Sequence, residues 1–521
     1  MELSTIKLHS VLQRGRAESQ ITLDDDYNVP DYRPDIVKVI CEQGNVRIEE
    51  VKPAAGAAWV KGKLLFAVLY RSDQENGKIS CLKGELPFQE KINMEGISEY
   101  DAVRVMGEIE DLTIGVIHSR KLNVRAVIVL CSQAQVPSVE EIADGAEMEE
   151  ECMQLRKPIE VSQQLFAKRD VCRQKNEIAL PSSKPNIREI LWKSVELRNV
   201  GSRLDSEGIH LTGEILLSIL YQEEEEPDRI QWYETTLPLE CGTDFEMERL
   251  TGEDLFYKIQ IEEIGKELEV KPDYDGEERM LVLELLLHVS VRLWQETKLE
   301  LLEDLYSLKQ NLIPERGTVH LEHLLIKNEA VCKVVEPMEL MENQEKILQI
   351  CSCEGTAHVD RMEKQPGGVF VEGTLTVNLM YITTDDHMPV GAVERIYPFE
   401  QFIEIPTTEG EVRLEQECNI VQLSASMLDQ SHAEIKAVIS IGVLAFSMKE
   451  VERIVSVKEE PLAIEEVQKI PGLVGYIVKN GDTLWSIAKQ YHTTTEALMQ
   501  QNQKKDETIK AGEKLLIVKE M

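Results

Sequence analysis

VKGKLLFAVLY, at residues 60–70, is the first of three similar segments in this 521-residue chain. LTGEILLSILY follows at residues 211–221, and VEGTLTVNLMY follows at residues 371–381. Each segment has a glycine followed eight residues later by a tyrosine, with apolar residues at alternate positions. Alternation with a period of two turns one apolar face of a strand toward a core, so each segment is predicted to be a β-strand.

Other positions repeat at fixed distances from these segments. A proline lies 17 residues after each tyrosine, at Pro87, Pro238 and Pro398. An isoleucine lies 26 residues before each glycine, at Ile36, Ile187 and Ile347. The first two copies open with P-x-x-x-P-x-Ile, whereas the third has Glu345 at the second proline. The copies are offset by 151 and 160 residues, so the chain contains one unit three times.

Each unit is predicted to be a separate β-rich domain. A glycine inside a strand pattern indicates a bulge or a close backbone approach, as expected at Gly62, Gly213 and Gly373. A unit of roughly 130 residues can bury its own core as a sandwich or barrel-like fold. Each unit also ends in a long apolar strand, at Leu122–Leu130, Met280–Leu293 and Glu434–Phe446.

The predicted organisation is therefore mostly β, with three tandem repeats and a small C-terminal domain. We place the repeats at residues 1–135, 166–300 and 326–460 and the last domain at residues 473–521. The connecting segments are an acidic linker at 136–165, expected to be helical or mobile, and shorter linkers at 301–325 and 461–472.

The charge and the chain ends narrow the class of protein. The formal net charge is −37, which disfavours nucleic acid as a partner because carboxylates repel phosphates. Residues 473–521 are near +1, which supports a domain change there. The N-terminus lacks the apolar stretch of a secretory signal, and no run of about 18 apolar residues suggests a membrane span. We therefore expect a cytoplasmic protein.

Ten cysteines form no recognisable metal pattern. Cys351 and Cys353 are the closest pair, and a zinc site needs two such pairs or a pair with histidines. In a reducing compartment we expect buried or isolated thiols, and we predict no metal and no cofactor.

The segment after Gly472 has a different pattern, which predicts β-α-α-β. Tyr476–Val478 is a short strand, and Asp482 or Thr483 is placed to cap a helix with an apolar face. Thr494 or Thr495 is placed to cap a second helix that ends near Asn502. A last strand spans Lys514–Val518.

These residues resemble the LysM family. The matching motif is Tyr476-x-Val478-x-x-Gly481-Asp482-Thr483-Leu484-Trp485-x-Ile487-Ala488, followed by Asn502 and by Ile509-x-x-Gly512-x-x-Leu515-x-Ile517. LysM domains bind glycans that contain N-acetylglucosamine. The resemblance implies a groove between two loops, formed by Gly481, Asp482, Thr483, Leu484, Thr508, Ile509 and Lys510. Alternatively, Asp482 and Thr483 only cap the helix, while Leu484 and Ile509 only pack.

Three repeats with the P-x-x-x-P-x-Ile opening and one terminal LysM together resemble the SipL family of spore-coat morphogenetic proteins. The repeats of that family are called SPOCS domains. The resemblance implies a mother-cell protein at the forespore surface. It also implies a partner, the coat-basement ATPase SpoIVA, which the LysM domain helps to bind.

Two functions from different classes follow. The first is a non-enzymatic adaptor in spore-coat assembly, since a cytosolic LysM does not ordinarily reach peptidoglycan. The alternative is a protein whose LysM binds peptidoglycan or N-acetylglucosamine glycans of the cell or spore wall. An enzyme is disfavoured, because the sequence has no P-loop, no G-x-S-x-G and no H-E-x-x-H. His320 and His323 form only an isolated H-x-x-H.

Overall fold

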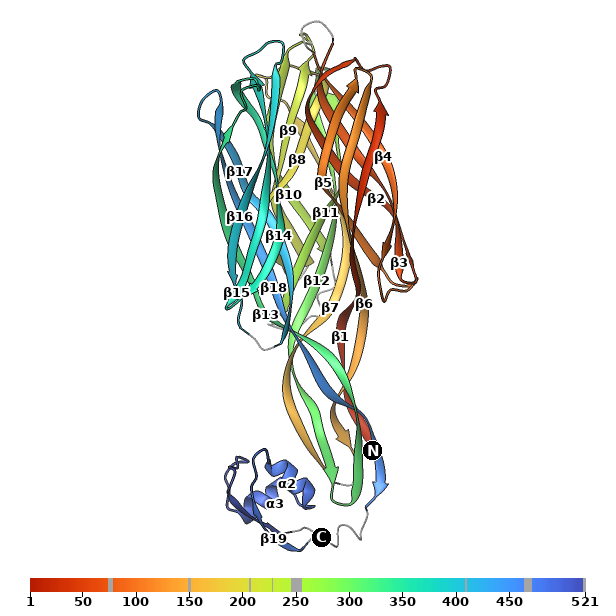
Figure 1. Cartoon of the computed structure of the whole chain (residues 1–521), viewed down its shortest axis with the longest axis vertical. Coiled ribbons are helices and arrows are strands. Elements are labelled where there is room, and N and C mark those ends of the chain that lie inside the picture. The colour runs from red at the N-terminus through yellow and green to blue at the C-terminus, as the bar shows by residue number, and fades with distance from the viewer. Residues whose placement is uncertain are drawn as a thin grey trace.

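The chain folds into three β-sandwich repeats, a stalk and a small domain at the end of the stalk (Figure 1). The computed structural model describes residues 1–73, 78–148, 151–205, 208–226, 228–244, 255–407, 410–462 and 471–518. It is 78% strand and has two short helices among these residues. The predicted mostly β fold with a βααβ module is therefore confirmed.

Each repeat consists of two three-stranded antiparallel sheets. In the first repeat the strand orders are β1-β6-β5 and β2-β3-β4. Apolar side chains from both sheets form one core between them. The strands are β1 Glu2–Asn28, β2 Ile36–Ala54, β3 Ala57–Ser72, β4 Ile79–Asn93, β5 Val103–His118 and β6 Lys121–Glu147.

The second and third repeats follow the same plan, with orders β11-β12-β7 and β10-β9-β8, then β13-β18-β17 and β14-β15-β16. The second repeat has β7 Cys152–Ala179, β8 Ile187–Leu204, β9 Gly208–Glu223, β10 Ile230–Asp244, β11 Leu255–Pro272 and β12 Glu278–Ser307. The third has β13 Gln310–Glu339, β14 Ile347–Gln365, β15 Gly368–Thr383, β16 Val390–Glu404, β17 Glu411–Met427 and β18 His432–Pro461. Both sequence patterns lie in central strands: the glycine–tyrosine segments in β3, β9 and β15, and the long apolar strands in β6, β12 and β18.

The repeated glycines lie where other atoms approach closely, as predicted. A Cβ at Gly62 would lie 2.5 Å from the Phe88 ring and 2.7 Å from the backbone oxygen of Arg47. A Cβ at Gly373 would lie 2.3 Å from the Phe399 ring. The neighbouring strand is also irregular here, with register shifts between Ile48 and Glu50 and at the corresponding places in the other repeats. Each glycine therefore makes room for a cross-strand side chain beside a bulge.

The repeated tyrosines are structural. Tyr70, Tyr221 and Tyr381 are at most 1% exposed. The Tyr70 hydroxyl donates to the carbonyl of Pro34 at 3.1 Å, and Tyr221 donates to that of Pro185 at 3.2 Å. The opening prolines and the tyrosine thus fix the turn that leads into β2 and β8.

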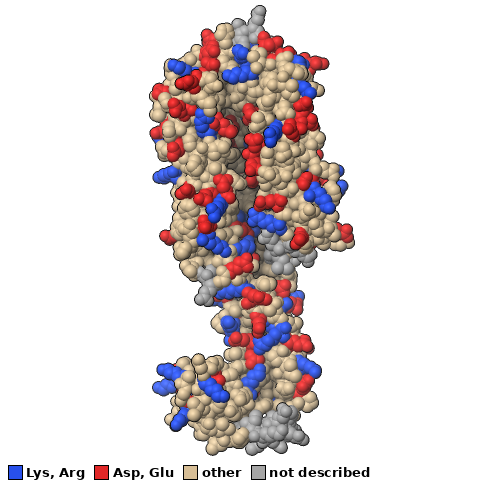
Figure 2. Space-filling view, viewed as in Figure 1, with Lys and Arg blue, Asp and Glu red and all other residues tan. Residues whose placement is uncertain are grey.

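Three long antiparallel strand pairs, each made of the first and the last strand of a repeat, leave the sandwiches and form the stalk, the narrow part of Figures 1 and 2. They are β1 with β6, β7 with β12, and β13 with β18. Apolar side chains from all three strand pairs pack together in two layers, Leu8, Ile142, Val161, Leu301, Val319 and Leu321, then Ala143, Ala146, Leu302, Leu305, Leu312 and Ile454.

The stalk occupies most of the segments expected to be linkers. Residues 136–147 continue β6, residues 152–165 belong to β7, and residues 301–325 are divided between β12 and β13. Buried residues such as Ile142 and Val161 lie among the acidic ones, and residues 136–147 and 152–165 are strand rather than helical or mobile. Glu149 and Glu150 lie outside the described residues. Most of the linker expected at 461–472 lies outside the described residues.

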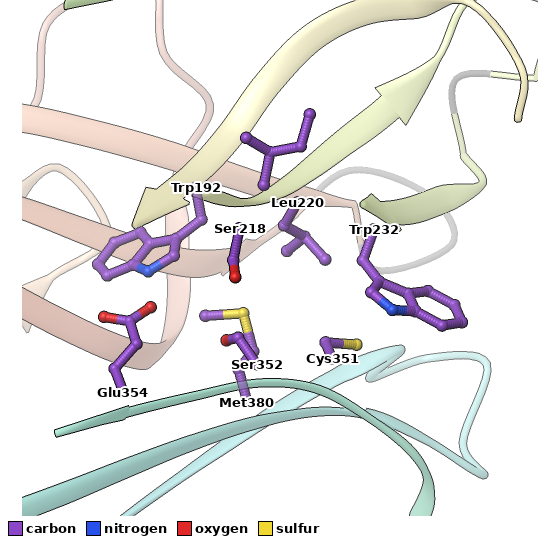
Figure 3. Close-up of a pocket in the computed structure, with 9 residues that line it drawn as sticks. Trp192, Ser218, Leu220, Trp232, Cys351, Ser352, Glu354 and Met380 are labelled. Atoms are coloured by element: carbon purple, nitrogen blue, oxygen red, sulfur yellow. The ribbon is translucent and has the colours of Figure 1, made fainter. Parts of the chain in front are cut away.

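The repeats meet along a shared apolar junction. The residue before each buried tyrosine, namely Leu69, Leu220 and Met380, belongs to one cluster with side chains from all three repeats. Figure 3 shows repeats 2 and 3 facing each other there, with Trp192 and Leu220 on one side and Glu354 and Met380 on the other. The cavity left between them is only about 10 Å³, room for about one water molecule.

A buried ion-pair network also joins repeats 2 and 3. The Glu415 carboxylate contacts Lys258 at 3.0 Å and Arg292 at 2.6 Å. Arg413 contacts Glu415 as well, and it also contacts Glu322 at 2.8 Å. Although burial opposes ionisation, these cations hold the pKa of Glu415 at about 2. The repeats are therefore fixed to one another by both apolar and charged contacts.

The expectation of ten thiols is wrong for one pair. Cys172 of β7 and Cys241 of β10 form a disulfide that joins the two sheets of repeat 2, with their Cα atoms 6.0 Å apart. The other eight cysteines are free thiols, and burial raises the pKa of Cys351 and of Cys353 to about 12. Sequence spacing did not indicate the pair, because 69 residues separate its members.

Candidate functional site: the LysM domain

The C-terminal domain is built from β19 Leu473–Ile477, α2 Leu484–Gln490, α3 Thr495–Gln501 and β20 Lys514–Val518. Thr483 caps α2 through a capping box with Ser486, and Thr494 caps α3 by accepting from the Ala497 amide. Leu484, Ile487, Ala488 and Leu498 form the small core with Leu515 and Ile517. The predicted order and the two caps are therefore observed.

The first of the two loops expected to form a groove is held by its own hydrogen bonds. Gly481 has a φ of +94°, which favours glycine there. The Asp482 carboxylate accepts from the Tyr476 hydroxyl at 2.8 Å and from the Lys479 amide at 2.7 Å. These donors, the Lys479 amide first, lower the pKa of Asp482. Asp482 thus orders the loop, Thr483 caps α2, and Leu484 is buried at 1% exposure.

The second of these two loops, at residues 508–510, exposes two polar side chains. The Thr508 amide donates to Asp506 at 3.0 Å, and the Lys510 amide donates to Glu513 at 3.1 Å. The side chains of Thr508 and Lys510 are exposed, while Ile509 packs against the core. The Gly512 amide donates to the Val478 carbonyl at 2.8 Å, which places the second loop against the strand that leads into the first.

A contact that the sequence did not reveal holds the LysM domain to the stalk. The Trp485 indole donates to Asp304 at 2.9 Å, and Lys489 contacts both oxygens of that carboxylate at 2.7 and 2.8 Å. Tyr306 donates to the Thr493 carbonyl at 2.8 Å, and its ring packs edge-on against Trp485. The domain is therefore docked through α2, while Gly481, Thr483, Thr508 and Lys510 remain exposed.

The sequence contained one sign of this contact between the stalk and the LysM domain, which we call the joint. Asp304 and Tyr306 lie in the segment expected to be a linker at 301–325. Leu302 and Leu305 in that segment are completely buried, and their apolar pattern could have indicated structure. No spacing rule pairs Asp304 with Trp485, which is 181 residues away.

Charge separates this domain from the repeats. On the face drawn in Figure 2, lysines are prominent on the LysM domain, whereas both signs are mixed over the repeats and the stalk. Among the described residues, no group of three or more His, Cys, Asp or Glu side chains is placed to hold a metal ion. Each described helix has seven residues, and no described helix has the length and apolarity that a membrane span requires.

Comparison with known families agrees with this architecture. The SipL SPOCS domain matches residues 35–117 and 346–428, and the LysM domain matches residues 476–518. The first two matches cover β2 to β5 of repeat 1 and β14 to β17 of repeat 3. Repeat 2 has the same strand plan but is not matched. No curated protein and no solved structure matches the chain.

The fold and its modules define a sporulation-associated, LysM-bearing protein made of binding or structural domains. More particularly, the chain is similar to SipL, because two of its segments match the SipL SPOCS domain and its C-terminal segment matches LysM.

Proposed function

We propose that this protein is a non-enzymatic adaptor in spore-coat assembly. In this role it binds the coat-basement ATPase SpoIVA at the forespore surface, partly through its LysM domain. It acts in the mother-cell cytoplasm. The observation that carries the proposal is the joint at Asp304 and Tyr306, which makes the LysM domain a fixed end piece of an elongated body. A fixed domain presents its binding surface without the ordering entropy that a freely tethered domain loses on binding.

The groove is the proposed ligand- or partner-binding site. Gly481, Asp482 and Thr483 form one wall with Leu484, while Thr508, Ile509 and Lys510 form the other. Its exposed side chains are polar and suit either a polypeptide or a glycan. The repeated titratable residues are the three buried tyrosines. They bond to backbone carbonyls or pack in the core, and this structural role supports an adaptor without catalysis.

A second candidate function is binding of N-acetylglucosamine glycans by the same groove. The exposed Thr508 and Lys510 side chains and the match to LysM favour it. In that case the protein acts on peptidoglycan of the cell or spore wall, and the repeats position the module.

Coimmunoprecipitation from sporulating cells tests the adaptor role. The full chain should capture SpoIVA, and a chain lacking residues 473–521 should capture much less. Absence of SpoIVA with the full chain, when both proteins are expressed, would reject the proposal.

Calorimetric titration of the full chain with N-acetylglucosamine oligomers tests the alternative. Heat at millimolar sugar that is lost in Lys510→Glu but kept in Lys505→Glu would favour the glycan. Both lysines are exposed, so the second variant is a matched control for charge.

A further inference from the structure

The LysM sheet has one face that its helices do not cover. On this face the side chains of Leu473 and Ile477 are 63% and 59% exposed, and those of Leu516 and Val518 are 45% and 37% exposed. Directly paired residues share a face, and the pairs are Leu473 with Val518, Gly475 with Leu516, and Ile477 with Lys514. The face is thus apolar apart from Lys514, and Gly475 leaves its centre flat.

The outer edge of β20 is closed by α3. Asn502 accepts from the Leu516 amide at 2.7 Å and donates to the Leu516 carbonyl at 2.8 Å. Gln501 bonds in the same way to the amide of Val518 at 2.9 Å and to its carbonyl at 3.4 Å. Strand addition at this edge is therefore blocked by two side-chain amides.

These bonds also determine which groups of β19 are unpaired. Leu516 and Val518 direct their backbone groups away from β19, so their partners Gly475 and Leu473 do the same on the opposite edge. The backbone groups of Ile477, two residues after Gly475, point to the same edge because the direction alternates along a strand. Within the described residues, no hydrogen bond reaches the amides or carbonyls of Leu473, Gly475 and Ile477.

We propose that the outer edge of β19 is a strand-addition site for an extended polypeptide of the SpoIVA-like ATPase. This inference rests on the adaptor function and names a surface for that partner. The added strand takes main-chain hydrogen bonds from Leu473, Gly475 and Ile477. Its alternate side chains extend the exposed apolar face.

The chemistry of the face specifies the occupant. Apolar side chains at alternate positions match Leu473 and Ile477, and a carboxylate on the incoming strand matches Lys514, the one charged side chain of the face. A second copy of this chain is a poorer occupant, because two bodies of net charge −37 repel each other. Self-association through β19 is therefore an outcome to be tested against the proposal.

Hydrogen exchange on the full chain tests the site without any substitution. When the purified SpoIVA-like ATPase is added, the amides of Leu473, Gly475 and Ile477 should exchange at least about tenfold more slowly. Protection confined to residues 508–513 would assign the contact to the groove and overturn the proposal.

Two substitutions at one residue provide a matched pair. Gly475→Pro removes an amide that points away from β20, so the sheet keeps its own bonds, and affinity for the ATPase should fall at least about tenfold. Gly475→Ala keeps the amide, and its Cβ would meet no atom within 4 Å, so affinity should change less than about threefold. Leu516→Glu places a charge on the face and should also weaken binding.

The outcomes separate this inference from the adaptor function. If the unmodified chain binds the ATPase and Gly475→Pro and Leu516→Glu bind equally well, the strand-addition site is rejected while the adaptor role stands. If the unmodified chain does not bind, both are rejected. A dimer that Gly475→Pro disrupts, with ATPase binding unchanged, would assign the edge to a second copy and reject the proposal.

Discussion

Repeats 1 and 3 match the SPOCS family, whereas repeat 2 has the same six strands and is not matched. One difference between them lies at the repeated glycine. Gly62 faces Phe88 and Gly373 faces Phe399, but Gly213 faces Leu239. The nearest atoms to a Cβ at Gly213 are also farther away, at 3.1 to 3.3 Å.

Repeat 2 compensates for the missing aromatic ring in other ways. In its bulge two residues, Asn199 and Val200, lie opposite the single residue Gly213, and Asn199 has a positive φ of 49°. Val200 fills the space beside Gly213. The Cys172–Cys241 disulfide then joins the two sheets covalently. All three repeats have the bulge, so one fold can be stabilised either by an aromatic ring packed on the glycine or by a bulge residue packed beside it together with a disulfide.

A glycine-to-alanine substitution at the repeated glycine should give the largest difference in stability loss between repeat 3 and repeat 2. In Gly373→Ala the Cβ would lie 2.4 Å from the backbone oxygen of His358, which cannot move aside, so repeat 3 should lose about 3–4 kcal/mol. Gly213→Ala should cost less than about 1.5 kcal/mol, because its neighbours need to shift only slightly. Differential scanning calorimetry of both full-length variants measures this, and equal losses would contradict the comparison.

Removing the disulfide should affect repeat 2 alone. Cys172→Ala with Cys241→Ala should lower the stability of repeat 2 by about 2–3 kcal/mol, since the unfolded segment regains chain entropy. Cys332 is the equivalent of Cys172 in repeat 3 and only donates weakly to the Glu400 carbonyl, so Cys332→Ala is the control and should cost about 1 kcal/mol or less. Thiol titration of the unfolded, unreduced chain should find eight thiols, and ten would refute the pairing.

Local patterns in the sequence were enough to predict the repeats, their strand character and the LysM module. Alternation and fixed spacing identified Gly62, Tyr70 and Ile36 as repeated structural positions. These residues contact neighbours on the same or the next strand, so a local pattern records them. The stalk was expected to be linkers, since the charge runs in 136–165 hid the buried residues among them, such as Ile142 and Val161. The joint between Asp304 and Trp485 and the Cys172–Cys241 bond depend on how distant segments meet, which no local pattern encodes.

The smallest predicted effect concerns one strand position that differs between repeats 1 and 3. Glu354 of repeat 3 faces repeat 2, and its equivalent in repeat 1 is the exposed Gln43. Burial raises the pKa of Glu354 to about 7, aided by the charge of Glu196, while Ser194, Lys266 and Arg198 oppose the shift. The folded chain therefore retains a proton that the unfolded chain releases above its ordinary pKa of 4.5.

This proton makes stability fall as pH rises from about 4.5 to about 7, with no further change from Glu354 above that window. At pH 8 the ionised carboxylate should cost on the order of 2 kcal/mol. Glu354→Gln, which gives repeat 3 the residue of repeat 1, should raise the melting temperature at pH 8 and leave it nearly unchanged at pH 5. Gln43→Glu should alter neither, because an exposed carboxylate keeps its ordinary pKa. A Glu354→Gln chain with the same pH dependence as the unmodified one would show that this carboxylate is not protonated between the repeats.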